Sequence, residues 1–515
     1  MLLATSAQIK LIDERVDKIL GISTYELIGR AGAAISRTVK DYVARGSKIV
    51  ILAGKGNNGA DGYAAANLLL EDHNVVIYDI FGVGQKENDG KRYAEQFVSR
   101  GGIVKAYTSP DDLKAELANA DCVIDAIFGI GVSGELPSFL ADVAELLRVE
   151  KNAVKIAVDI PLGIISDDGR VDERFAYVAD ATVSLCLLKP CNVSYPSKGY
   201  MGKLYYDSID ISVTDVIPEK DFLYHFVDGD NISDLLPIRE DNTNKGSFGK
   251  LLLITGSSEY PGAGRLSLEA ALRGGAGFVA YLGEKEQNES LLRDFPETIF
   301  KSRKALSCLQ DADIAEIVEL ADKYDSVLIG SGCGRSDGLL RLLKALLASY
   351  EGNLILDADA INVLSEEREA SLGLIKDSQA RVIITPHPLE FSRISGVSVD
   401  AVNRDRIKCA RDFSLKCGCI TVLKGAATVI TDGERCYVNS SGSSALAKAG
   451  SGDVLAGALA SLVTSSAELL TSSAAAVYMH GRAADELAKE LSVFGVIPSD
   501  LPRQIAVEIA KCKIE

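Results

Sequence analysis

Two residue types are scarce in this sequence: tryptophan is absent, and histidine occurs only four times. The histidines lie far apart and form no HExxH-like pair, which leaves a zinc or iron site without support. The ten cysteines are scattered, and the CGC at 417–419 has the spacing of neither a zinc knuckle nor a disulfide framework. We therefore expect reduced, mostly buried thiols, and catalysis by carboxylates, backbone amides and bound ligands.

The chain also lacks an excess of basic residues and a long apolar run. Lys and Arg number 55 against 72 Asp and Glu, so the formal charge of −17 offers no basic stripe for a nucleic-acid backbone. No apolar run reaches the roughly 18 residues of a membrane span. The start, MLLATSAQIKLIDERV, carries acids and bases instead of a signal-peptide core. These features predict a cytoplasmic protein that binds neither nucleic acid nor membrane.

What the sequence does contain is an alternation of short β-branched runs with longer amphipathic stretches, which is typical of parallel α/β sheets. A first series of predicted strands comprises 48–54, 74–80, 121–129, 154–161, 181–188 and 203–211. A second series comprises 250–256, 326–332, 353–361, 381–387 and a hairpin within 420–439, with Asp432-Gly433 as its tight turn. A polar, proline-marked stretch near 212–228 separates the two series. At 515 residues the chain favours two domains.

A glycine- and asparagine-rich segment, GKGNNGADG (54–62), directly follows the predicted strand KIVILA and opens a helix. The free N–H groups of such a loop and of the helix N-terminus can hold a phosphate. The segment is neither a GxGxxG fingerprint nor a P-loop, which would need a Lys-Ser/Thr pair after its second glycine. A plain connecting turn is the alternative, although such a turn needs no cluster of amides and a carboxylate.

Asp125 and Asp159 stand near the carboxyl ends of two further predicted strands, in VIDAIFGIG and AVDIPLG. Ligands of open α/β sheets collect at that edge, so these carboxylates and the segment 54–62 could converge on one site. For each aspartate alone, capping a turn is the commoner explanation, and only their combination suggests a site.

A further glycine-rich motif is KAGSGDVLAG (448–457), in which Asp453 precedes apolar residues at helical spacing. A helix dipole at this point favours negative charge on Asp453 and on a phosphoryl oxygen alike, and the glycines let a ligand approach the backbone. A simple helix N-cap is the alternative.

Together these motifs carry a family resemblance. LAGKGNNGADG, DAIFGIG and VDIP resemble the N-terminal epimerase domain of the bifunctional NAD(P)H-hydrate repair enzymes. GSSEYPGA (256–263), LDADAIN (356–362), TPHPLE (385–390) and KAGSGDVLAG are similar, in order and spacing, to that family's C-terminal dehydratase domain. The resemblance covers nearly the whole chain. It implies an α/β protein with a Rossmann-like doubly wound domain at 1–222 and a ribokinase-like domain at 223–515.

The resemblance also implies an activity, the repair of NADH and NADPH that have added water to the reduced ring. The first domain would interconvert the R and S hydrates and use potassium. The second would dehydrate the S form at the expense of ADP, with magnesium, giving AMP and phosphate. ADP is implied by the fused architecture alone, since eukaryotic relatives use ATP. The family resemblance alone also implies a homo-oligomer.

For the first domain, the resemblance implies that the hydrate contacts Asn57, Asn58, Gly59, Ala60, Asp61, Gly129, Ile130, Gly131, Val132, Ser133, Gly134, Glu135 and Asp159. Potassium would be held by Asn58, Asp125 and the backbone carbonyl of Leu162. A carboxylate beside a cation keeps its charge and can exchange a proton with the substrate, so Asp125 is our candidate for the acid–base role. The chain departs from the family at Leu162, where a serine is usual, and at Ala60, where a glycine is usual.

For the second domain, the resemblance implies that Asp453 takes the proton of the added hydroxyl while the helix N–H groups hold the transferred phosphate. Ala263, Gly332, His387 and Asp453 would contact the hydrate. The nucleotide would contact Lys424, Gly425, Ala426, Ala427, Thr428 and Gly452. Leu389 replaces the glycine usual in TPHPGE. The rival interpretation is a ribokinase-like small-molecule kinase with a non-catalytic N-terminal binding domain.

Overall fold

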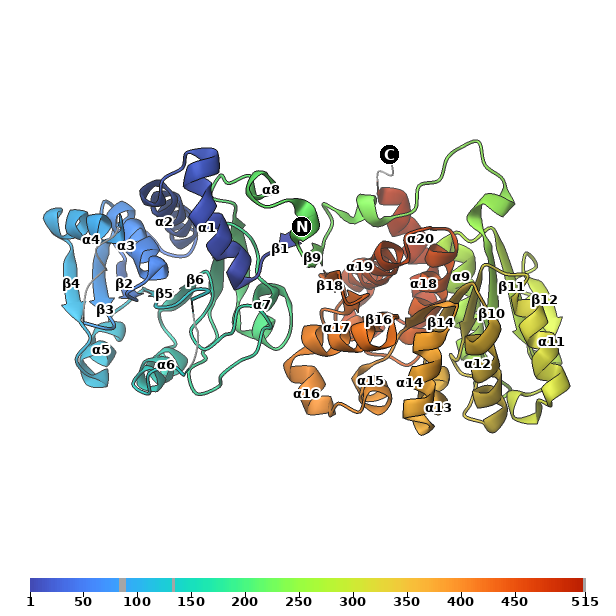
Figure 1. Ribbon diagram of the computed structural model, residues 1–515. Coiled ribbons are helices and arrows are strands. Elements are labelled where there is room, and N and C mark those ends of the chain that lie inside the picture. The colour runs from blue at the N-terminus through green and yellow to red at the C-terminus, as the bar shows by residue number, and fades with distance from the viewer. Residues whose placement is uncertain (83–88, 132–134, 513–515) are drawn as a thin grey trace. The chain divides into compact units, whose positions relative to one another are not determined.

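The computed structural model describes residues 1–82, 89–131 and 135–512 (Figure 1). The chain divides into two units, Leu2–Tyr224 and His225–Glu515, the latter together with Met1. Each unit contains its own sheet and its own buried apolar clusters.

The sheet of the N-terminal unit is parallel throughout and has the strand order β4-β3-β2-β5-β6-β7-β8. Its strands are β2 (Lys48–Ala53), β3 (Asn74–Asp79), β4 (Ile103–Ala106), β5 (Cys122–Ala126), β6 (Val154–Val158), β7 (Ala181–Leu185) and β8 (Lys203–Asp207). Strand β2 alternates its side chains between two cores, with Ile49 and Ile51 on one face and Val50 and Leu52 on the other. Both faces of the sheet are therefore buried, as a parallel sheet requires.

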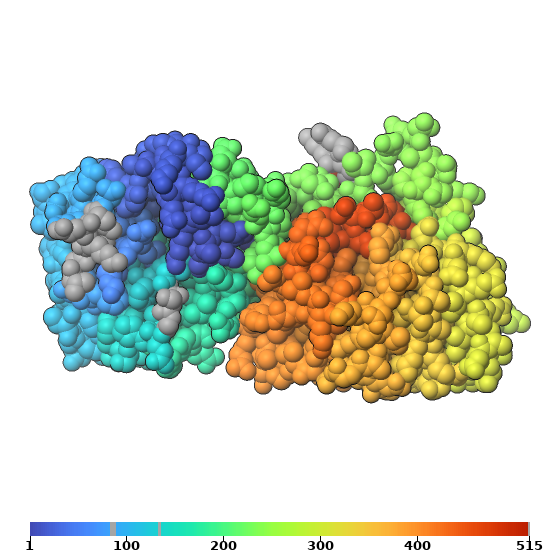
Figure 2. Space-filling model, viewed as in Figure 1, coloured from blue at the N-terminus to red at the C-terminus, as the bar shows by residue number. Residues whose placement is uncertain are grey.

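Helices cover both faces of this sheet. The Ile49 face packs against α1 (Ser6–Leu20), α2 (Thr24–Lys40), α3 (Asn57–Leu69) and α4 (Asp89–Ser99). The Val50 face packs against α5 (Pro110–Leu117) and α6 (Leu140–Val149). Helix α1 buries Ile9, Ile12 and Val16, and its opposite side contributes to the dark-blue surface in Figure 2.

The order of the strands creates a crevice at the carboxyl end of the sheet. From β2 the chain moves to β3 and β4 on one side, and then returns to place β5 on the other side of β2. The loops after β2 and β5 consequently leave the sheet in opposite directions, which is where open α/β sheets bind ligands.

The sheet of the C-terminal unit has the order β9-β18-β17-β16-β15-β14-β13-β10-β11-β12. The strands from β16 to β12 are parallel, whereas β17 pairs antiparallel with both of its neighbours. Its strands are β9 (Tyr224–Val227), β10 (Lys250–Ile254), β11 (Phe278–Gly283), β12 (Ile299–Ser302), β13 (Ser326–Ile329), β14 (Asn353–Leu356), β15 (Arg381–Ile384), β16 (Ile420–Leu423), β17 (Val429–Thr431) and β18 (Cys436–Asn439). As in the first sheet, the order in which strands are added reverses at a central strand. Strands β11 and β12 lie on one side of β10, and β13 lies on its other side, which makes this the switch point of the sheet.

One face of this sheet packs against α9 (Pro261–Gly274), α18 (Ser451–Thr464), α19 (Leu469–Gly495) and α20 (Leu501–Lys511). The remaining helices follow the successive strands in Figure 1, and they are α10 (Lys285–Leu292), α11 (Asp311–Ala321), α12 (Asp337–Ser349), α13 (Asp359–Glu366), α14 (Arg368–Asp377), α15 (Pro388–Ser395), α16 (Val399–Arg404) and α17 (Arg406–Cys417). Along the described residues, no helix combines the length and the apolar character needed to cross a membrane.

The predicted fold class, two successive α/β units with parallel sheets, is confirmed. Two details of the prediction are wrong. The run at 353–361 is strand only to Leu356, and helix α13 begins at Asp359. In the hairpin turn Gly433 has a φ of 98°, but Asp432 is not in the left-handed region. The turn instead closes through Asp432, whose carboxylate accepts the N–H groups of Glu434 and Arg435.

Candidate active sites

The first cavity lies at the switch point of the N-terminal sheet and has a volume of about 370 Å³. Segments from α1, α2, the loop after β2, the loop after β5 and the ends of β6 and β7 surround it. Of the predicted site residues, it is lined by Asn57, Asn58, Asp61, Gly129, Ile130, Gly131 and Asp159.

The loops after β2 and β5 approach each other closely at this cavity. A Cβ atom on Gly54 would collide with the carbonyl oxygen of Ile127, so a side chain at Gly54 would force the loops apart. Helix α3 then begins with Gly56 as its N-cap, and no side chain caps its first N–H groups. This helix end can therefore donate to an anionic group of a ligand.

Asp159 and Lys189 form a buried ion pair at the wall of this cavity. The Lys189 Nζ also donates to the carbonyl oxygen of Leu185 at 2.8 Å and approaches Ser184 Oγ at 3.4 Å. Asp159 has a φ of 66°, a conformation that only a few non-glycine residues adopt. The second carboxylate oxygen, Asp159 Oδ2, and Asn58 Oδ1 both lie 3.2 Å from the position of a Cβ atom on Gly129. The two oxygens thus converge on one point of the glycine loop.

Two further carboxyl groups line the same cavity. Burial raises the pKa of Asp61 well above its usual range, and the charges of Asp159 and Asp13 add to that effect. Burial likewise raises the pKa of Asp13 to about 6, with Asp159 contributing and Lys189 opposing the rise. The cavity therefore brings together carboxyl groups that can hold a proton near neutral pH.

Asp125 lies on the other side of the sheet, beside the Val50 cluster. Its carboxylate accepts hydrogen bonds from the backbone N–H groups of Ile127 (3.1 Å) and Leu162 (2.9 Å) and from Tyr177 Oη (3.0 Å). Burial raises the pKa of Asp125 to about 6, and these three donors oppose the rise. Asp125 is not among the described residues that line the cavity. Its predicted acid–base role stays a prediction.

The structure places the remaining predicted residues of this site as follows. Gly59 and Ala60 are buried in the first turn of α3, and Leu162 is buried beside Asp125. Glu135 is exposed and does not line the cavity. Val132, Ser133 and Gly134 lie outside the described residues.

The second cavity lies at the switch point of the C-terminal sheet and has a volume of about 510 Å³. It is lined by Glu259, Tyr260, Ala263, Gly332, Gly334, Arg335, Asp359 and Asp453. Three predicted substrate contacts from distant parts of the sequence, Ala263, Gly332 and Asp453, therefore share one cavity. Gly332 has a φ of 63°, and a Cβ atom on it would lie 2.5 Å from Ala263 Cβ. A glycine is needed there for both reasons.

Asp453 lies in the first turn of α18, whose N-cap is Gly450 with a φ of 100°. It is therefore not the helix cap that the alternative interpretation required. Burial raises the pKa of Asp453 to about 7, with Asp357 and Asp359 adding to the rise and Lys424 opposing it. A carboxylate with this pKa is suited to accepting a proton near neutral pH.

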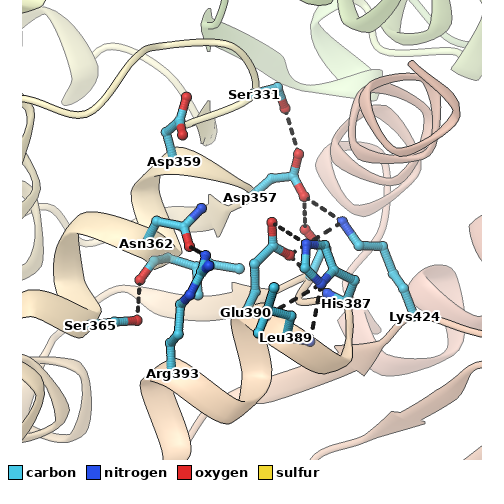
Figure 3. Close-up of polar contacts among 12 residues, drawn as sticks. Ser331, Asp357, Asp359, Asn362, Ser365, His387, Leu389, Glu390, Arg393 and Lys424 are labelled. Carbon is cyan, nitrogen blue, oxygen red and sulfur yellow. Dashed lines mark hydrogen bonds and ion pairs between the residues drawn. The ribbon is translucent and has the colours of Figure 1, made fainter. Parts of the chain in front are cut away.

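Lys424 connects this helix end to a polar network around Asp357 (Figure 3). Its Nζ donates to Asp357 Oδ1 at 2.9 Å and lies 3.9 Å from Glu390 Oε2. Asp357 also accepts hydrogen bonds from Ser331 Oγ and Thr385 Oγ1, both at 2.7 Å. Although burial acts in the opposite direction, these partners hold the pKa of Asp357 below its usual value. The network keeps a cation fixed beside the N-terminus of α18.

His387 belongs to this network and does not line the second cavity. Its Nδ1 accepts the backbone N–H groups of Leu389 (3.1 Å) and Glu390 (3.3 Å), so it caps α15. Burial lowers the pKa of His387, and Lys424 and Arg393 lower it further. The neutral ring therefore carries its proton on Nε2, which lies 3.3 Å from Glu390 Oε1.

The predicted nucleotide contacts from Lys424 to Thr428 form the turn between β16 and β17, whereas Gly452 lies in the first turn of α18. Thr428 Oγ1 accepts the N–H of Gly425 at 3.2 Å and donates to the Gly425 carbonyl at 2.9 Å, and Ala427 has a φ of 54°. A Cβ atom on Gly452 would lie 3.6 Å from Lys424 Nζ, which links this turn to α18.

Sequence reasoning missed several residues that the structure adds to the two sites. Asp357 directly follows strand β14, so the rule that singled out Asp125 and Asp159 could have found it. Glu390 follows β15 within a motif already quoted. Lys189 and Asp13 carry no such signal, because neither stands directly after a strand in a glycine-rich motif.

Comparisons with known proteins agree with this two-part organisation. Residues 24–191 match the family model of the YjeF-related protein N-terminus, and residues 251–506 match that of NAD(P)H-hydrate dehydratase. A ribokinase-like superfamily protein from Enterococcus faecalis is 24% identical and aligns with a TM-score of 0.50 over 57% of this chain and 97% of its own. That likeness supports the ribokinase-like fold of the C-terminal unit.

Two curated relatives match both units. The bifunctional NAD(P)H-hydrate repair enzyme of Thermofilum pendens is 32% identical over 95% of this chain and 93% of its own length. That of Coxiella burnetii is 31% identical over 95% of each chain. Given this identity across both units, the chain belongs to the family of bifunctional NAD(P)H-hydrate repair enzymes.

Proposed function

We propose that this protein repairs hydrated NADH and NADPH. The N-terminal domain, 1–222, interconverts the R and S hydrates, and the C-terminal domain, 223–515, dehydrates the S form with ADP as phosphoryl donor. The observation that carries the proposal is the position of Asp453, which lines the second cavity with Ala263 and Gly332 at the N-terminus of α18. Family membership supports both activities.

In the dehydration, Asp453 accepts the proton of the added hydroxyl, and the resulting oxygen attacks the terminal phosphoryl group of ADP. The P–O bond between the two phosphoryl groups breaks, and AMP leaves. The ring carbon then loses this oxygen as phosphate, a good leaving group, and a proton from the neighbouring carbon is released as the double bond reforms. The free N–H groups of α18 and the Lys424 ammonium stabilise the charge of the transferred group.

The nucleotide is proposed to lie along Lys424, Gly425, Ala426, Ala427, Thr428 and Gly452. Magnesium suits this arrangement because it usually needs only one or two protein carboxylates beside the phosphate oxygens. Asp357 and Glu390, both within 4 Å of Lys424 Nζ, supply such oxygens. Bound magnesium would neutralise phosphate charge during the transfer.

In the epimerisation, the added hydroxyl takes a proton and leaves as water, while the lone pair of the adjacent ring nitrogen forms a double bond to the carbon. Water then adds to the opposite face and gives up a proton, so no net oxidation or proton change occurs. The carboxyl groups of the first cavity can supply and recover this proton. An ionised carboxylate also stabilises the cationic ring between the two steps.

Potassium is proposed to bind near Asn58, Asp125 and the Leu162 carbonyl. The donor set consists of amide, carboxylate and carbonyl oxygens, which hard cations prefer. The Asp125 carboxylate already accepts three hydrogen bonds, so it would contribute a preoriented charge. A cytoplasmic location, which the sequence composition favours, and a homo-oligomer, which the family resemblance implies, remain proposals.

The test is a time course on a mixture of R and S hydrates with ADP or ATP. We expect release of NADH together with inorganic phosphate, faster with ADP, until both epimers are consumed. A stable phosphorylated product would instead indicate a small-molecule kinase. Consumption of the S form alone would show that the N-terminal domain is not an epimerase.

A further inference from the structure

We propose that Lys189 is a positioning residue of the first cavity. In this inference its ammonium fixes Asp159 Oδ1 and so directs Asp159 Oδ2, as a carboxylate, toward the substrate ring. The inference rests on the proposed epimerase function of the N-terminal domain and names a residue that the family resemblance does not single out.

The hydrogen bonds of Lys189 exclude it as a proton donor to the substrate. Its three N–H donors face Asp159 Oδ1, the Leu185 carbonyl and Ser184 Oγ. Its side chain is 1% exposed, so the ammonium presents no free donor to the cavity. Lys189 can therefore act only through the residues it contacts.

The two carboxylate oxygens of Asp159 differ in their contacts: Oδ1 accepts two hydrogen bonds, whereas Oδ2 lies at the cavity. Its Oδ1 accepts from Lys189 Nζ and from the backbone N–H of Leu185 at 3.3 Å. Within the part of the chain that the structure describes, no hydrogen bond reaches Oδ2, which lies at the cavity beside Asn58 Oδ1 and the Gly129 loop. One oxygen is thus anchored and the other is available to a ligand.

The carboxyl groups around the Asp159–Lys189 ion pair explain why the Lys189 ammonium is needed at this cavity. The titratable and charged groups that face it are Asp13 and Lys10 from α1, Asp61 from α3, Lys55 from the loop after β2, and the thiols of Cys186 and Cys191. The carboxyl groups of Asp13 and Asp61 repel an ionised Asp159, and Lys189 lowers the pKa of both. Without the ammonium, the carboxyl groups of Asp13 and Asp61 would take up a proton at higher pH.

This arrangement serves a reaction that develops positive charge. When the hydroxyl leaves, the ring nitrogen becomes cationic, and a carboxylate held in place stabilises that charge without reorganising. The fixed Asp159 Oδ2 is the oxygen available for this purpose.

The experiment compares the pH profile of epimerisation in the full-length protein and in Lys189→Met. We expect kcat to fall by about 10²-fold at neutral pH and the acidic limb of the profile to move to higher pH, while dehydration of pure S hydrate is unchanged. Lys48→Met is the matched control, since Lys48 pairs with Glu116 away from the cavity, and its profile should equal that of the parent. An unmoved limb in Lys189→Met would overturn the proposal, whereas absence of epimerisation in the parent would overturn the proposed function instead.

A second comparison applies even if Lys189→Met does not fold. Asp159→Asn and the double variant Asp159→Asn/Lys189→Met both lack the ionised carboxylate, and the double variant buries no unpaired cation. If Lys189 acts through Asp159, the two should epimerise at the same rate within about threefold. A double variant that is tenfold slower than Asp159→Asn would show that Lys189 acts on the substrate itself.

Discussion

At the scale of single residues, Asp453 connects burial to a pH dependence. Its pKa is raised to about 7, so the carboxylate that accepts the substrate proton is largely protonated below that pH. At ADP concentrations well below saturation, where the free enzyme predominates, the rate of S-hydrate dehydration should therefore rise with pH up to about 7 and then level off. Initial rates from pH 5 to 9 measure this, and a rate that is flat across the range would contradict the assignment of Asp453 as base.

The substitution Asp453→Asn tests the same residue at fixed pH. The amide keeps the size of the side chain but cannot accept the proton, so dehydration should fall by about 10²-fold or more while nucleotide binding is largely retained. Epimerisation by the same variant is the internal control, because Asp453 lies in the other sheet's cavity. A near-parental dehydration rate would remove Asp453 from the mechanism.

The sequence predicts an acid–base role for Asp125, whereas in the structure Asp125 is not among the described residues that line the first cavity. Asp125→Ala removes a buried carboxylate that holds two backbone N–H groups and the Tyr177 hydroxyl, and with it the proposed potassium ligand. We expect R-to-S conversion to fall by about 10²-fold. Added potassium up to high concentration should not restore the rate of this variant. Rapid and complete consumption of mixed epimers would show that Asp125 is not essential.

At the scale of elements, the loop after β5 offers a matched pair of glycines. A Cβ atom on Gly129 would lie 3.2 Å from both Asn58 Oδ1 and Asp159 Oδ2, whereas one on Gly131 would meet nothing within 4 Å. Gly129→Ala should therefore slow epimerisation by about tenfold, because small displacements of positioned groups are costly to catalysis. Gly131→Ala should remain near the parental rate. Equal rates for the two variants would show that the close approach of Asn58 Oδ1 and Asp159 Oδ2 to this loop does not contribute to epimerisation.

The strands of the two sheets could largely be predicted from the sequence, because buried parallel strands are short β-branched runs with little polar content. Strands β4 (Ile103–Ala106) and β12 were missed because they are largely exposed edge strands. Strand β11 is buried but was missed as well, because FVAYLG contains only one β-branched residue. The end of β14 was misplaced because LDADAI alternates apolar residues with aspartates, a period-two pattern that is typical of a strand, through the turn into α13. Local composition does not record where hydrogen bonding to a neighbouring strand ends.

The candidate sites could be predicted where a motif coincides with the end of a strand, as at Asp159, or with the start of a helix, as at Asp453. Lys189 could not, because its partner Asp159 is 30 positions away and a lysine after a strand usually indicates a solvated turn. The separation of Asp125 from the cavity also could not be predicted. It depends on which face of β5 each side chain occupies, and a shift of one residue reverses that.

At the scale of the whole molecule, the two candidate sites belong to units with separate cores, so the epimers should pass between them through solution. A mixture of Asp125→Ala and Asp453→Asn proteins should then convert mixed hydrates to completion, although neither variant does so alone. The measurement is the NADH released at saturating ADP by each variant and by the mixture. Failure of the mixture would mean that both sites must act within one chain.

The placement of Lys424 has a consequence for the order of events on the enzyme. Its ammonium lowers the pKa of Asp453, but a bound nucleotide phosphate would share that positive charge. Asp453 should therefore bind its proton more tightly in the nucleotide complex, and near pH 7 ADP binding should draw protons from solution. Calorimetric titrations in two buffers of different ionisation enthalpy would detect this uptake. Such linkage also means that, at saturating ADP, the pH at which the dehydration rate levels off should lie above 7, because Asp453 must lose its proton before it can accept that of the hydrate.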